Sequence, residues 1–121
     1  MGVINHNAVI ASTWCQEDVA KMKDWIAELT DEEQNLFLVG GPQTNSETTV
    51  VMIPDGSKEG WEQSDKGDAL RARFIIELEK SKYEDGSNNW CWIEVGFGEF
   101  GQKVLQGNNK NCYGKEEYCG N

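Results

Sequence analysis

The chain has 121 residues, 38% of them hydrophobic, and its formal net charge is −10 because 21 acids outnumber 11 bases. That length suits one domain, and the five Trp, four Phe and three Tyr argue against disorder. A strongly negative field repels nucleic acid and anionic membranes, so we expect neither as a direct partner. The N-terminus does not resemble a signal peptide, and no apolar run is long enough to span a membrane. We therefore expect a cytoplasmic protein.

Sequence patterns in the first half of the chain predict three strands and a helix. Residues 8–11 form a short apolar run, typical of a strand that begins near Val3. Thr13 and Gln16 have the spacing of a capping box, and apolar residues then recur at helical spacing, which predicts an amphipathic helix over residues 14–29. After a polar break at residues 30–35, the apolar runs 36–39 and 48–53 predict two strands paired as a hairpin.

The second half predicts another helix and two more strands. Ser64 or Asp65 can cap a helix that carries one apolar stripe. On that helix, Arg73 and Glu77 have the spacing of an ion pair. Residues 90–100 alternate, so one side of the strand carries polar or small residues, as suits a sheet with one face in solvent. Residues 103–106 predict a last strand. The helical stripe is Leu70, Phe74 and Leu78; the two sides of the strand are Cys91, Ile93, Val95 and Phe97, and Trp90, Trp92, Glu94, Gly96 and Gly98.

The order of these elements is strand, helix, strand, strand, helix, strand, strand. Without the last strand it is βαββαβ, the order of the ferredoxin-like split βαβ fold. We therefore expect a single α+β domain over residues 1–106, with an antiparallel sheet and two helices on one face. Residues 107–121 are polar and rich in Gly and Asn, so we expect a loosely ordered tail.

The connector, residues 54–68, is the strongest candidate for a binding surface. It holds five acids, three glycines and one tryptophan. Long loops in compact domains are usually functional or disordered, and a large aromatic among charges is typical of a binding anchor. Trp90 and Trp92 could extend this surface as an aromatic patch. The candidate binding residues are therefore Asp55, Glu59, Trp61, Glu62, Asp65, Asp68, Trp90 and Trp92.

Metal and redox chemistry have weaker support in the sequence. The stretch from Asp55 to Gly60 matches the start of an EF-hand loop, but Lys66 occupies the position of the bidentate Glu, so we expect no metal or cofactor. The Trp-Cys pair at Cys15, between a strand and a helix, locally resembles the active-site turn of thioredoxin-like proteins, although Asp18 replaces the second cysteine. Cys91 is expected to be a buried thiol. Cys112 and Cys119 could form a disulfide, but reduced thiols are favoured.

These patterns together favour a non-catalytic protein that binds a partner protein through the partner's basic surface. In size and charge the chain is similar to inhibitors encoded by phages and mobile elements, which cover basic sites that normally hold nucleic acid. Two alternatives stay open: a small-molecule pocket under Trp90 and Trp92, and a one-thiol redox enzyme that uses Cys15.

Overall fold

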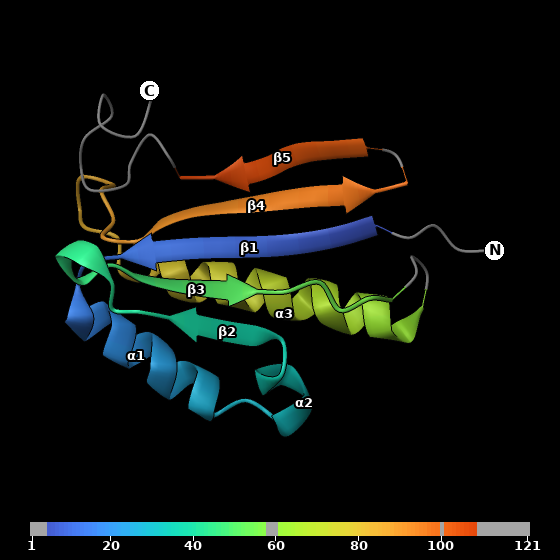
Figure 1. The fold of residues 1–121 in the computed structure, drawn as a ribbon, viewed down its shortest axis with the longest axis horizontal. Coiled ribbons are helices and arrows are strands. Elements are labelled where there is room, and N and C mark those ends of the chain that lie inside the picture. Colours follow the sequence, from blue (N-terminus) through green and yellow to red (C-terminus); the bar gives the residue numbers. More distant parts are fainter. Residues whose placement is uncertain (1–4, 58–60, 100, 109–121) are drawn as a thin grey trace.

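The computed structural model describes residues 5–57, 61–99 and 101–108, and this part of the chain forms an α+β fold (Figure 1). Five antiparallel strands make one sheet with the order β2-β3-β1-β4-β5. The strands are β1 (Asn5–Thr13), β2 (Phe37–Gly40), β3 (Thr48–Met52), β4 (Cys91–Gly98) and β5 (Gly101–Gly107). The helices are α1 (Gln16–Ala27), α2 (Asp31–Gln34) and α3 (Glu62–Glu79), with a 3-10 turn, η1 (Thr44–Ser46).

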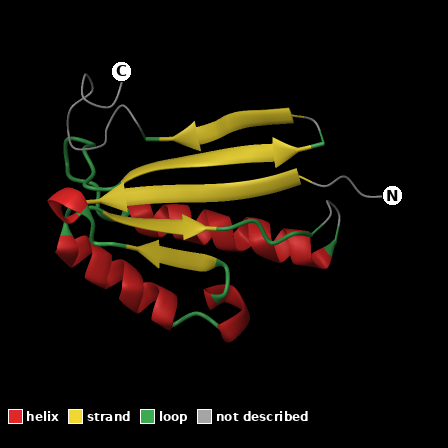
Figure 2. Cartoon of the chain, viewed as in Figure 1, coloured by secondary structure: helices red, strands yellow, loops and turns green. Residues whose placement is uncertain are grey.

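Both long helices pack on the same face of the sheet, and the strands pass in front of α3 in Figure 2. Three rings join the layers: Trp25 of α1 lies 5.8 Å from Phe37 of β2 and 6.1 Å from Phe74 of α3, between ring centroids. Burial of large aromatic side chains such as these is a major favourable contribution to folding. The remaining buried core residues are Val9, Ala11, Val19, Met22, Leu29, Val50, Met52, Leu70, Leu78, Trp90 and Trp92.

The predicted alternation in β4 is correct, but its polar-looking side faces the core. Trp90, Trp92 and Glu94 are buried beneath the helices, whereas Cys91 and Ile93 are half-buried on the other face. Two tryptophans bury more apolar area than Cys and Ile can, so they decide which side the helices cover. In the described part of the chain no helix covers the other face of the sheet, and we call it the open face. Its strand positions are His6, Ala8, Ile10, Ser12, Leu38, Gly40, Thr49, Val51, Cys91, Ile93, Val95, Phe97, Gln102 and Val104.

The helix boundaries differ from prediction at α1 and α2. Thr13 belongs to β1, and its hydroxyl accepts a hydrogen bond from the Cys15 N–H (3.1 Å), so the expected capping box of Thr13 and Gln16 is absent. The N-cap of α1 is Cys15. The capping box lies instead in the predicted polar break, where Thr30 and Glu33 exchange hydrogen bonds and start α2. That pair has the required spacing in the sequence, and the lack of an apolar stripe concealed the helix.

Helix α3 begins earlier than predicted, with Trp61 as its N-cap, and Ser64 and Asp65 lie inside its first turn. The expected ion pair between Arg73 and Glu77 is wrong. Arg73 binds Glu33 of α2 at 3.1 Å, because α2 brings a carboxylate across to it, and Glu77 pairs with Lys80 at 2.7 Å.

The end of the described chain is tied to the sheet. The Asn108 side chain accepts a hydrogen bond from the Trp92 N–H and donates one to the Trp90 carbonyl, each 2.8 Å long. Gly107 is the last residue of β5. Residues 109–121, including Cys112 and Cys119, lie outside the described residues. Among the helices of the described part, none is long and apolar enough to cross a membrane.

Candidate functional site

The connector is shorter than the sequence indicates, because its second half is helical. Glu62, Asp65 and Asp68 lie in the first two turns of α3. Residues 53–57 form the described part of the loop, and Glu59 lies outside the described residues. The candidate surface is therefore a helix start joined to a short anchored turn.

Asp55 orders the turn and packs against α3. Its Oδ1 accepts hydrogen bonds from the backbone N–H (3.0 Å) and hydroxyl (2.7 Å) of Ser57, forming an Asx turn. Its Oδ2 is buried against Gly67 of α3 and has no hydrogen-bond partner among the described residues. A Cβ added at Gly67 would lie 1.9 Å from this oxygen. Glycine in a helix interior costs about 1 kcal/mol relative to alanine, and here its missing side chain makes room for the Asp55 carboxylate.

A buried charge network supports the same part of α3. Arg71 is 6% exposed, and its guanidinium donates to Asp68 and lies 3.9 Å from the Glu94 carboxylate of β4. Glu94 is also buried and accepts a hydrogen bond from Gln106 of β5 at 2.7 Å. Buried charges are tolerated only when they are paired, so this network fixes how α3 lies on β4 and β5.

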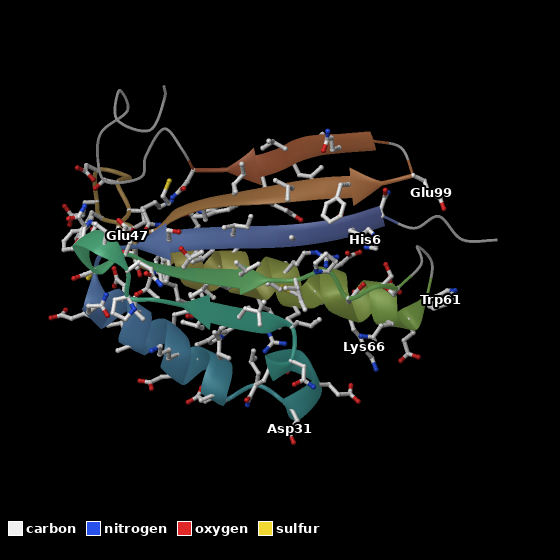
Figure 3. All side chains as sticks on the ribbon, viewed as in Figure 1. His6, Asp31, Glu47, Trp61, Lys66 and Glu99 are labelled. Carbon is white, nitrogen blue, oxygen red and sulfur yellow. The ribbon has the colours of Figure 1, made fainter. Side chains whose placement is uncertain are left out.

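Trp61 is the exposed aromatic of the candidate surface. Its side chain is 53% exposed at the start of α3, at the same end of the molecule as His6 and Glu99 (Figure 3). Glu62, Asp65 and Asp68 are exposed on the following turns. Glu62 forms an exposed pair with Lys66 at 3.6 Å, and such pairs contribute little to stability. The structure thus brings Trp61 together with three of the predicted acids.

Trp90 and Trp92 do not extend this surface. They are 1% and 5% exposed, and the expectation of an exposed aromatic patch at these residues is wrong. The Trp92 indole N–H donates to Glu79 of α3 at 3.3 Å, which satisfies its polar atom inside the core. Trp14 is the exposed tryptophan that the sequence analysis overlooked, with 50% of its surface accessible between β1 and α1. Its position directly after a strand was the available signal.

One residue from each of the two alternatives lines the same cleft. A hollow of about 440 Å³ lies between α1 and the end of α3, and both Cys15 and Trp90 line it. Asp18 lies in its wall, 8% exposed, and accepts a hydrogen bond from Asn89 at 3.1 Å. Lys21 and Lys82 also line the cleft.

The second described thiol is half-buried on the open face. Desolvation, reinforced by the negative charge of Glu47, raises the pKa of Cys91 above its ordinary value. Cys91 is therefore less buried than expected, and its thiolate is disfavoured. Within the described ranges, no three Cys, His, Asp or Glu side chains are grouped closely enough to hold a metal ion.

The chain gives no significant match to a protein-family model, to a curated protein or to a solved structure.

Proposed function

We propose that the protein is a non-catalytic binding protein whose surface at the start of α3 covers a basic surface of a partner protein. The observation that carries the proposal is the exposure of Trp61 beside three acidic side chains on a firmly held helix start. Asp55 and Arg71 restrain the loop and helix, so little conformational freedom is lost when a partner binds.

The acids and Trp61 have different roles in this surface, because one group is charged and the other is apolar. The acids steer a basic partner into contact and mainly affect the association rate. Trp61 supplies apolar contact area, and aromatic anchors of this kind carry most of the binding energy in many interfaces. Inhibition by occlusion, as in proteins encoded by phages and mobile elements, is the mode of action that we infer for such a surface.

The test is affinity capture with three matched proteins: the native chain, Trp61→Ala and Trp14→Ala. Trp14 is a suitable control because its exposed fraction, 50%, is close to the 53% of Trp61. We expect Trp61→Ala to weaken binding of a captured basic protein by at least about 30-fold, and Trp14→Ala to leave it unchanged. Asp65→Asn should cause a smaller loss that disappears in high salt. Equal retention of the same partners by all three proteins would refute the proposal.

A second candidate is small-molecule binding in the cleft between α1 and α3. It is favoured by one observation, the meeting of Cys15 and Trp90 at the same hollow. Ligands found by thermal-shift screening should lose their effect in Cys15→Ser and retain it in Trp61→Ala. The opposite pattern would exclude the cleft.

We further propose that the fold is a ferredoxin-like split βαβ to which β5 has been added. Its support is the order of the first four strands in the sheet, β2-β3-β1-β4, with α1 and α3 as the two crossover helices on one face. An experimental structure with a different strand order would refute this assignment.

A further inference from the structure

The middle of the open face is apolar across the sheet. Strand register places Leu38, Val51, Ile10 and Ile93 in one row across four strands. Register likewise aligns Ala8, Val95 and Val104 in a second row. Several of these side chains are well exposed, including Leu38 (58%), Val104 (62%), Phe97 (43%) and Ile10 (38%).

This face carries no Asp, Glu, Lys or Arg at its described strand positions, although the whole chain has a net charge of −10. Glu47, directly before β3, and Glu99, directly after β4, lie at opposite ends of the sheet (Figure 3). The charged side chains of the helices lie on the far side of the sheet. Large apolar patches rimmed by polar residues mark interaction sites on soluble proteins.

The size of the face suits a small but specific interface. Five strands about 4.8 Å apart are about 24 Å wide, and about six residues per strand give about 20 Å of length. The face therefore covers about 480 Å². Two such faces bury about 1,000 Å² together, which is near the lower limit for a specific protein interface.

We propose that the open face packs against the open face of a second copy of this chain, forming a two-fold symmetric dimer. An apolar, uncharged sheet face has no charge that opposes contact with a second copy of itself, and sheets commonly stack face to face about 10 Å apart. Stacking in this way turns both charged helix layers outward, which separates the two negative charges. A basic partner has no counter-charge to meet on this face.

The chain's own residues 109–121 are a poorer match. They include Lys110, Lys115, Glu116 and Glu117, whose burial on an uncharged face would be costly. In the proposed dimer, β1 crosses β1 of the second copy because it is the central strand, so Ile10 lies at the centre of the interface. Trp61 is on the helix side, so this inference is independent of the proposed function.

The test is sedimentation equilibrium of the full chain and three variants from about 1 to about 200 µM. Leu38→Asp and Ile10→Asp place a charge on the open face, and Ile76→Asp is the control. Ile76 and Leu38 are both 58% exposed, but Ile76 lies on α3. We expect a native dimer, a dissociation constant at least about 100-fold weaker in the two open-face variants, and no change in Ile76→Asp.

Circular dichroism and urea unfolding show whether each variant is folded. If Ile10→Asp does not fold, Leu38→Asp still tests the interface. Ile10 lies on the central strand, away from the edges of the sheet. Loss of the dimer in Ile10→Asp therefore indicates stacking of the two faces and not pairing of exposed edge strands. A native chain that is monomeric at 200 µM would overturn the proposal and leave the face to residues 109–121 or to another protein. A dimer that survives both open-face substitutions would overturn it as well.

Discussion

Replacement of Gly67 by alanine tests how the connector is attached to α3. In a helix interior this change normally stabilises by about 1 kcal/mol, because alanine is the better helix former. In this protein the new Cβ would lie 1.9 Å from Asp55 Oδ2 and 3.0 Å from its Cγ, so the carboxylate must move. Overpacking of this kind costs about 1–3 kcal/mol. We expect Gly67→Ala to destabilise the native protein by about 0–2 kcal/mol.

The sign should reverse when the carboxylate is absent. In an Asp55→Ala background the obstructing atoms are gone, and Gly67→Ala should stabilise by about 1 kcal/mol. Urea unfolding followed by circular dichroism gives the four free energies of the double-mutant cycle, with an expected coupling of about 1–3 kcal/mol. Stabilisation of the native protein by Gly67→Ala alone would show that Asp55 does not occupy the space over Gly67.

Two further predictions concern titratable groups. Hydrogen bonds from the Thr30 N–H and from Arg73 hold the pKa of Glu33 below its ordinary value, so the stability that Glu33 provides is present above its unfolded pKa and lost as the pH falls through the lower folded pKa. The difference in unfolding free energy between the native protein and Glu33→Gln should therefore shrink below about pH 4, and a constant difference from pH 7 to pH 3 would contradict this. Because desolvation and Glu47 raise the pKa of Cys91, its alkylation at pH 8, followed by peptide mass spectrometry, should be slower than that of free cysteine. Glu47→Gln should accelerate the alkylation of Cys91 without changing the rate at Cys15. Equal rates of Cys91 alkylation in the native protein and in Glu47→Gln would show that Glu47 does not raise the pKa of Cys91.

Local patterns in the sequence determined the kinds and order of most elements. Helical periodicity predicts α1 and α3 and alternation predicts β4, since the side chains that face a core repeat with the period of their own backbone. The other four strands are predicted from short apolar runs. The stripe of Leu70, Phe74 and Leu78 is buried as predicted. The missed helix, α2, has a capping box but no apolar stripe, and pattern analysis depends on such a stripe.

The candidate surface was only partly predictable. Trp61 and the acids after it were identified from composition, and they do lie together at the start of α3. The support beneath them was not visible in the sequence. Asp55 meets Gly67 only because a loop folds back on a helix, and Arg71 meets Glu94 only because α3 crosses β4.

The sequence by itself determined the acidic composition, the amphipathic helices and the alternation of β4. The tertiary structure decided which side of β4 is buried, because alternation divides a strand into two faces without saying which one a helix covers. Trp90 and Trp92 were assigned to the surface from their neighbours in sequence, yet they fill the space under α3. In the described part of the chain, their burial leaves the opposite face of the sheet without a helix over it, and that consequence follows from packing in three dimensions.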